Sequence, residues 1–355
     1  MSRRPPGAPE AGVPAGSERP DTSRRPGRTR KSYVSRWGIT GVNLYRAVRA
    51  VADSGGDGPV DWTAAGTAAR AGTDPGELTL SAADRQGYAD DVGDARDAIR
   101  SVAGLEFDLP EGVQVQNRHH WIDANVVTFE RLLAPLEDRT ALAPSLARSA
   151  NTGSMAITLG FLSNNVLGQY DPLLMGSGDH ELYFVHPNIE AAATNLDVDR
   201  DRFRRWIAFH EVAHAAEFGA APWLSGRLET ATEDAVSKLA DGGLDRSALA
   251  ELNRTMTAVE GYAELVMDRA FDREYADLRE KLEERRSDVG PVSAVIRRLL
   301  GLGMKRRQYE RGREFFDAVA DARGVEAAGA VWDSPDNLPT DEELDNPDRW
   351  LARVD

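Results

Sequence analysis

The sequence predicts a mostly helical α+β protein with a small β-sheet, and three observations support this prediction. Long segments, among them residues 117–136 and 197–219, place apolar residues at helical spacing. One segment, ELYFVHPNI at 181–189, is rich in β-favouring residues and closes on Pro187, as is typical of a strand. With 355 residues and 41% apolar content, the chain can bury a substantial core.

The chain is expected to divide into a tail and one domain. Residues 1–31 hold eight basic and three acidic residues among many prolines and glycines, so this segment is predicted to be a disordered basic tail. Residues 32–355 are predicted to form a single domain. Its last part, from about residue 333, is acidic and punctuated by prolines, which predicts a loosely packed C-terminal segment.

Within the domain, short helices separated by glycine and proline loops are expected up to about residue 103. Asp197 or Asp199 can cap the helix at 197–219, and Gly219 with Pro222 can end it. Further helices are expected at residues 117–136, around 154–172 and at 247–272, and two more around 293–320.

The charge of the chain restricts its partners and its setting. The formal net charge is -15, and Lys31, Lys238, Lys281 and Lys305 are its only lysines. An acidic, arginine-rich composition suits a salty, halophilic cytoplasm. An acidic surface repels phosphate backbones and anionic lipids, so membrane binding is excluded and nucleic-acid binding is left only to the basic tail, as a weak interaction. No export signal or long apolar stretch is found, which predicts a cytoplasmic protein.

The pentapeptide HEVAH at 210–214 carries the strongest chemical signal. Residues four apart lie one turn above each other on a helix, so His210 and His214 can direct one nitrogen each at a common point. This supplies half of a tetrahedral zinc site, and Glu211, about 100° round the helix, is placed to act as a general base. Cysteine is absent, so a further ligand must be a histidine or a carboxylate.

The segment VEGYAELVMD supplies the missing ligand. It places Glu260, Glu264 and Asp268 at intervals of four, beside an apolar stripe. Glu260 is therefore predicted as the third Zn(II) ligand, and Glu264 as the carboxylate that orients one imidazole by a hydrogen bond. Glu217, on the same face as His210, is the alternative third ligand, although three ligands from one short helix converge poorly.

Two further residues are candidates for stabilising an oxyanion. His186 closes the expected strand at 181–189, which could border a cleft and hold an extended peptide by backbone pairing. Tyr262 follows the expected third ligand by two residues. For both side chains, a structural role is favoured over this one.

The sequence resembles a family of zinc-dependent metalloproteases or hydrolases of actinobacteria and archaea, described as associated with biosynthesis of the deazaflavin coenzyme. The segments that carry the resemblance span nearly everything after the tail: FLSNNVLGQYDPLL, HPNI, FRRWIAFHEVAHAAEFGAAPWL, VEGYAELVMD, RRLLGLGMKRRQYERGREF and NLPTDEELDNPDRWLAR. It implies a zincin-like architecture with a helical body and a small sheet. No residue of the chain argues for the coenzyme link.

Carried over residue by residue, the family pattern implies metal ligands at His210 and His214, a base at Glu211, and an Glu-Gly-x-Ala-Glu motif at 260–264. The chain departs from the pattern where Tyr262, Leu265 and Glu217 stand in place of His, His and Gln. The expected activity is hydrolysis of a peptide or small amide by water that zinc activates. The alternative is a zinc-stabilised scaffold or partner-binding protein with little or no hydrolytic activity.

Overall fold

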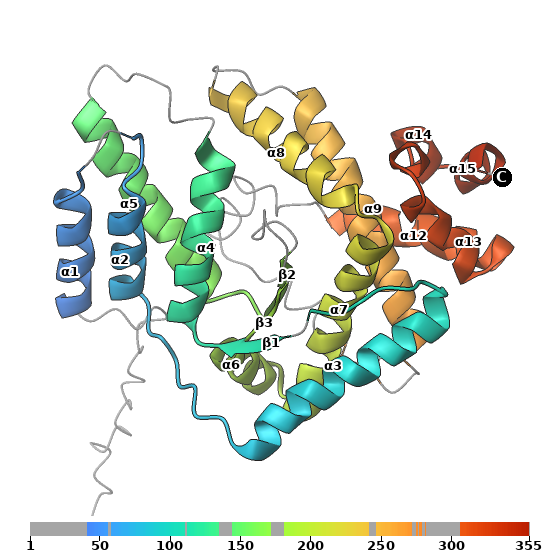
Figure 1. Ribbon diagram of the computed structural model, residues 1–355, viewed down its shortest axis with the longest axis horizontal. Coiled ribbons are helices and arrows are strands. Elements are labelled where there is room, and N and C mark those ends of the chain that lie inside the picture. Colours follow the sequence, from blue (N-terminus) through green and yellow to red (C-terminus); the bar gives the residue numbers. More distant parts are fainter. Residues whose placement is uncertain are drawn as a thin grey trace, which may run out of the picture. The chain divides into compact units, whose positions relative to one another are not determined.

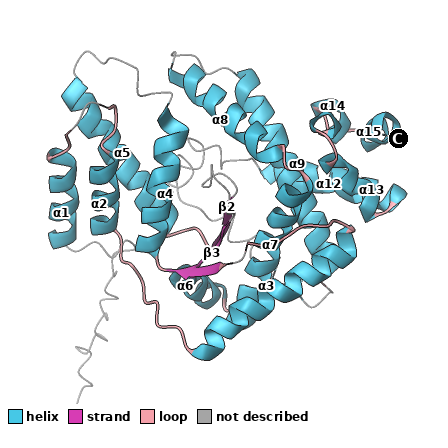
Figure 2. Ribbon diagram, viewed as in Figure 1, coloured by secondary structure: helices cyan, strands magenta, loops and turns pink. Residues whose placement is uncertain are grey.

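Helices dominate the computed structural model, and the strands are few and short (Figure 2). The structure describes residues 41–55, 58–110, 112–134, 144–171, 181–240, 246–271, 275, 277, 278, 281 and 306–354. The predicted tail at residues 1–31 lies outside these residues. So do residues 293–305 of the two helices predicted around 293–320. No described helix is long and apolar enough to cross a membrane.

The helices of the first half share a small apolar core. These helices are α1 (Gly41–Ala52), α2 (Trp62–Gly72), α4 (Arg118–Leu133) and α5 (Pro144–Ser163). Trp121 and Ile122 of α4 pack with Leu159 and Leu162 of α5 in this core. The side chain of Asn117 accepts hydrogen bonds from the amides of the first turn of α4, which fixes where that helix begins.

A larger core forms around four long helices (Figure 1): α3 (Ala82–Ala103), α7 (Arg200–Ala220), α9 (Arg246–Ala270) and α12 (Arg306–Arg323). α7 packs against both α3 and α9, and α9 packs against α12. Two further helices, α6 (His186–Leu196) and α8 (Leu224–Ala240), contact α7 and α9 respectively. The segment at 197–219 is thus a central helix of this core.

Buried residues occur all round α7, as expected for a helix enclosed on several sides. Asp199 caps it by accepting from the amide of Arg202 at 2.8 Å, as the sequence predicts for one of two candidates. The other candidate, Asp197, instead ends α6 in the left-handed conformation, with φ 52°. The buried ion pair between Arg204 of α7 and Asp91 of α3, 2.7 Å apart, ties the two helices together.

The small sheet has three strands, β1 (Val113–Gln116), β2 (Gly168–Asp171) and β3 (Glu181–Val185), in the order β1-β3-β2. β3 pairs in parallel with β1 and antiparallel with β2. Both edges of β3 are therefore occupied, so the expectation that it pairs with a peptide substrate is wrong.

Two boundaries near the sheet differ from the expected ones. The helix expected around 154–172 ends at Ser163, and the residues GQYD form β2. The strand expected at 181–189 ends at Val185, because His186 begins α6 and Pro187 stands in its first turn. Proline has no amide hydrogen, but an amide in the first turn of a helix has no acceptor within that helix. Proline at this position therefore costs no helical hydrogen bond.

The acidic C-terminal segment is well packed, so the expectation of loose packing is wrong. After α13 (Val325–Gly329) and the 3-10 turn Ala330–Trp332, it forms the 3-10 turn Pro335–Asn337, α14 (Asp341–Leu344) and α15 (Pro347–Val354). Trp332, Leu344 and Trp350 are buried in the larger core, and Arg353 pairs with Glu343. The segment is ordered because the apolar residues among its carboxylates bury enough surface against the core.

α9 and α12 approach each other at two glycines. A Cβ on Gly261 would lie 2.6 Å from the backbone of Gly312, and one on Gly312 would lie 2.5 Å from the carbonyl oxygen of Thr257. Only glycine permits this approach. Because Gly261 follows Glu260, this contact fixes the position of the predicted metal ligand on α9.

Candidate metal centre

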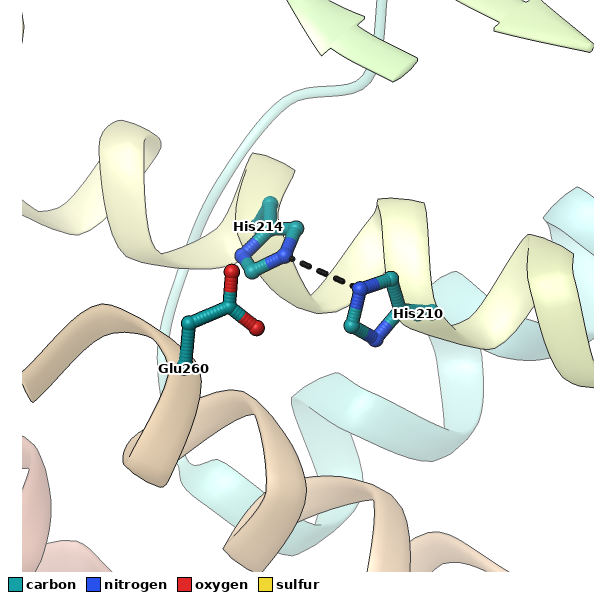
Figure 3. A group of neighbouring side chains, drawn as sticks. All are labelled: His210, His214 and Glu260. Atoms are coloured by element: carbon teal, nitrogen blue, oxygen red, sulfur yellow. Dashed lines mark hydrogen bonds between the residues drawn. The ribbon is translucent and has the colours of Figure 1, made fainter. Parts of the chain in front are cut away.

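Three side chains from two helices converge at the candidate site (Figure 3). His210 and His214 extend from neighbouring turns of α7, and Glu260 extends from α9 toward them. One potential ligand atom from each residue lies within 4.8 Å of the other two. Among the described residues, this is the one group of histidines and carboxylates with such geometry, and it is the set that the sequence predicts.

The spacing of the two imidazoles fits a shared metal ion. The Nε2 atoms of His210 and His214 lie 3.3 Å apart. Two nitrogens at tetrahedral positions, each about 2.0–2.1 Å from zinc, are separated by about 3.3–3.4 Å. All three side chains are half-buried, so the group is held by the core while remaining open to solvent on one side. The donor set of two nitrogens and one carboxylate suits Zn(II).

Glu217 sets the orientation of His214. Its Oε2 lies 2.9 Å from Nδ1 of His214, one helical turn back along α7. If Nδ1 donates its hydrogen to this carboxylate, Nε2 carries a free lone pair toward the metal position. The sequence predicts this orienting role for Glu264, which is half-buried one turn beyond Glu260, and that role of Glu264 stays a prediction. Glu217 is not in the converging group, so the geometry favours Glu260 as the third ligand.

Glu211 lies beside the edge strand of the sheet. Its Oε2 accepts a hydrogen bond of 2.9 Å from the backbone amide of Tyr170 in β2. A Cβ on Gly168 would lie 2.6 Å from both Cγ and Oε1 of Glu211, so only glycine fits there. The predicted base is thus held in one position by β2, an interaction that the sequence pattern does not reveal.

Burial and charge shift the proton affinities of these groups. Burial raises the pKa of Glu211 to about 7, against the lowering effect of His214 and of the Tyr170 amide. For His214, burial by itself lowers the pKa, but Glu217, Glu260 and Glu211 outweigh it and raise the pKa to about 9. The carboxylates around His214 therefore favour a positive charge at this position, as a site for a divalent cation requires.

Trp206 supports the other imidazole. Its ring stacks on that of His210, with centroids 5.7 Å apart and planes 9° from parallel. The two residues are four apart on α7, so the stack lies along one face of the helix. This contact restricts the rotation of the His210 ring.

The two oxyanion candidates lie in other surroundings. Tyr262 is 1% exposed, and its ring packs edge-on against Phe316 and Trp332. Nδ1 of His186 lies 3.0 Å from the hydroxyl of Tyr88. Neither residue belongs to the converging group, and the oxyanion roles stay predictions.

Comparison with known proteins agrees with this arrangement. A crystal structure from Chloroflexus aurantiacus, described as that of a candidate hydrolase with a novel fold, matches with a TM-score of 0.67 and 28% identity, over 88% of this chain and 98% of that one. No curated protein matches the chain. The model of the zincin-like metallopeptidases matches residues 60–245 and 240–351, which include both candidate-site helices. The chain therefore belongs to the family of zincin-like metallopeptidases.

Proposed function

We propose that this protein is a zinc-dependent metallopeptidase that hydrolyses an amide bond in a peptide or small amide substrate. The observation that carries the proposal is the convergence of His210, His214 and Glu260, with the two Nε2 atoms at the separation expected for ligands of one zinc ion. Membership of the zincin-like metallopeptidases supports the reaction class.

His210, His214 and Glu260 would hold the ion. When bound, zinc supplies a Lewis acid that lowers the pKa of water to about 7 and polarises the scissile carbonyl. The three ligands are half-buried, so they keep some contact with solvent.

Glu211 would act as general base and then as general acid. With Oε2 held by the Tyr170 amide, Oε1 is available to take a proton from the attacking water and to pass it to the leaving amine. A buried carboxylate held beside the candidate metal position can take up a proton and release it again as the reaction proceeds.

The experiment compares the wild type with Glu211→Gln, using a mixture of short peptides and mass spectrometry to detect new termini. The amide cannot accept the proton, so hydrolysis should fall by about 100-fold or more, while zinc content stays the same. Loss of zinc in the variant, or unchanged turnover, would contradict the assigned base. Full zinc content without turnover by the wild type would favour the scaffold alternative.

A further inference from the structure

The strand that confines Glu211 is short and is paired along one edge. β2 spans Gly168–Asp171, and β3 is its strand partner among the described residues. Backbone pairing alone holds such a short edge strand weakly, because its residues have little β-propensity. Yet β2 carries both groups that hold the carboxylate, the Tyr170 amide and the backbone of Gly168. Its position therefore requires a further attachment.

β2 lies between α7 and α4 (Figure 1), and its side chains alternate between the two helices. The Cβ position of Gly168 faces Glu211 of α7. The Tyr170 ring lies against that of Phe218, also of α7, with centroids 5.7 Å apart. Gln169 stands between Gly168 and Tyr170, so its side chain leaves the opposite face of the strand, where it meets α4.

Three hydrogen bonds link Gln169 to Trp121 and Asn125 of α4 in a closed ring. The indole Nε1 of Trp121 donates to Oε1 of Gln169 at 2.7 Å, and Nε2 of Gln169 donates to Oδ1 of Asn125 at 3.3 Å. Nδ2 of Asn125 donates to the carbonyl oxygen of Trp121 at 2.9 Å. Trp121 and Asn125 are each 3% exposed, so the α4 side of this ring is shielded from water.

The chemistry of the ring allows one orientation of the Gln169 amide. An indole nitrogen only donates, so Oε1 of Gln169 must face Trp121 and its amide nitrogen must face Asn125. A backbone carbonyl only accepts, so Asn125 uses its nitrogen there and presents its oxygen to Gln169. Rotation of Gln169 would break both of its bonds and leave a buried indole N–H without an acceptor, which is costly. The side chain is therefore locked in place.

We propose that Gln169 is a positioning residue for the predicted base, Glu211. Held by Trp121 and Asn125, its side chain fixes β2 from the face opposite α7. Fixed in this way, the strand presents the Tyr170 amide to Oε2 of Glu211 at 2.9 Å. This inference rests on the proposed function, which assigns the base role to Glu211.

The expected consequence is a change in turnover without a change in metal binding. If β2 shifts, the Glu211 carboxylate loses its amide donor and its place, so both proton transfers slow. The three predicted zinc ligands stand on α7 and α9, and none of them is a partner of Gln169. A fall in kcat with unchanged KM is the kinetic signature of an interaction that acts in the transition state.

The kinetic test compares the wild type with Gln169→Met, Trp121→Phe and the double variant, on a peptide that the wild type hydrolyses. Methionine has a similar length but forms neither hydrogen bond, and phenylalanine keeps an aromatic ring but lacks the N–H. Each single variant should lower kcat by at least about 10-fold, with KM and zinc content unchanged. Because both break the same ring, the double variant should be little slower than either. Wild-type kcat in a folded single variant, or fully additive losses, would overturn the inference.

Two matched variants serve as controls. Trp350 is also a buried tryptophan, 1% exposed, and its indole Nε1 donates to the carbonyl oxygen of Asn337 at 2.6 Å. Gln114 is also a strand glutamine, in β1, and its Nε2 donates to Oε1 of Glu181 at 2.8 Å. Trp350→Phe and Gln114→Met should keep wild-type kcat even where the melting temperature falls. If they lower kcat as much as Gln169→Met does, the loss reflects general destabilisation and the inference fails.

A second readout requires no activity. In metal-free protein that carries isotope-labelled tyrosine, nuclear magnetic resonance identifies the Tyr170 amide as the signal that is lost in Tyr170→Phe. The hydrogen of this amide should exchange with solvent at least about 3-fold faster in Gln169→Met and Trp121→Phe, because its bond to Glu211 opens more often. The Tyr262 amide, within α9, should keep its wild-type rate and serves as the internal reference.

The two proposals can fail separately. If the wild type hydrolyses no peptide, the proposed function fails, and exchange of the Tyr170 amide alone decides the role of Gln169. If that exchange is unchanged in Gln169→Met, or is equally fast in Trp350→Phe, then Gln169 does not hold the strand. The inference is then overturned whether or not the protein is an enzyme.

Discussion

At the scale of single residues, the candidate site combines ligands that face a common point with neighbours that hold them. Trp206 stacks on His210, Glu217 contacts Nδ1 of His214, and the Tyr170 amide binds Glu211. Each contact restricts a side chain that would otherwise rotate. Restricting these rotations before the substrate arrives is what allows a site to stabilise a transition state.

The glycine against the predicted base gives the first prediction. In Gly168→Ala, the new methyl group would overlap Cγ and Oε1 of Glu211, so the carboxylate or β2 must move. Since a misplacement of about 1 Å can lower turnover by about 100-fold, we expect a loss of up to that size in kcat with zinc content retained. Gly93→Ala, where an added Cβ meets nothing within 4 Å, is the control and should keep wild-type kcat.

The sequence predicts that His210, His214 and Glu260 lie together, because helical geometry is local. Two histidines four apart define their own relative position, and an acidic stripe on a second helix limits the choice of the third ligand to a few residues. The contacts of Gly168 and Tyr170 with Glu211 could not be predicted, because they depend on how β2 packs on α7. The contact of Glu217 with His214 could be predicted from their spacing of three residues. However, Glu217 also lies on the same helix face as His210, which made it a candidate metal ligand.

At the scale of elements, the site depends on how α7 is held between α3 and α9. The side chains of Arg204 and Asp91, each 10% exposed, join α7 to α3. The contact between Gly261 and Gly312 joins α9 to α12. One of these contacts is electrostatic and the other is steric, and each can be removed separately.

Removing one partner of the buried ion pair tests the first contact. Asp91→Ala leaves the Arg204 guanidinium buried without its closest carboxylate, so the free energy of unfolding should fall by about 3 kcal/mol. Asp97→Ala, which removes an exposed carboxylate paired with Arg96, should change it by less than about 1 kcal/mol. Equal effects in urea denaturation would contradict the importance of burial for this pair.

Filling the glycine contact tests the second. In Gly312→Ala, the added Cβ lies 2.5 Å from the Thr257 carbonyl oxygen, and overpacking of this kind costs about 1–3 kcal/mol. Because α9 carries Glu260, zinc affinity should also fall. Gly226→Ala, on an exposed position of α8 with nothing within 4 Å, should instead stabilise the protein by about 0.5–1 kcal/mol. A stable Gly312→Ala variant with wild-type zinc affinity would show that α9 tolerates the displacement.

The long helices rich in apolar residues were predictable, as α4 and α7 show. The strand β2 was missed, because the residues GQYD have little β-propensity and become a strand only through pairing with β3. The C-terminal segment was misjudged for a related reason. Its acidic composition concealed the few residues, Trp332, Leu344 and Trp350, whose burial orders it.

At the scale of the whole molecule, the net charge of -15 sets the response to salt. Repulsion among excess carboxylates opposes the compact state, and salt screens it over about 10 Å at 0.1 M. We therefore expect the melting temperature to rise as sodium chloride is increased from about 0.1 M to about 1 M, where the screening length is about 3 Å. A falling melting temperature would mean that exposed ion pairs, which salt weakens, contribute more than the net repulsion.

Elemental analysis of extensively dialysed protein tests whether His210, His214 and Glu260 form one zinc site. The wild type and Glu211→Gln should each contain one zinc ion per chain, whereas His210→Ala should contain far less than one. A wild type that contains no bound metal, or a His210→Ala variant that keeps its full content, would contradict the claim.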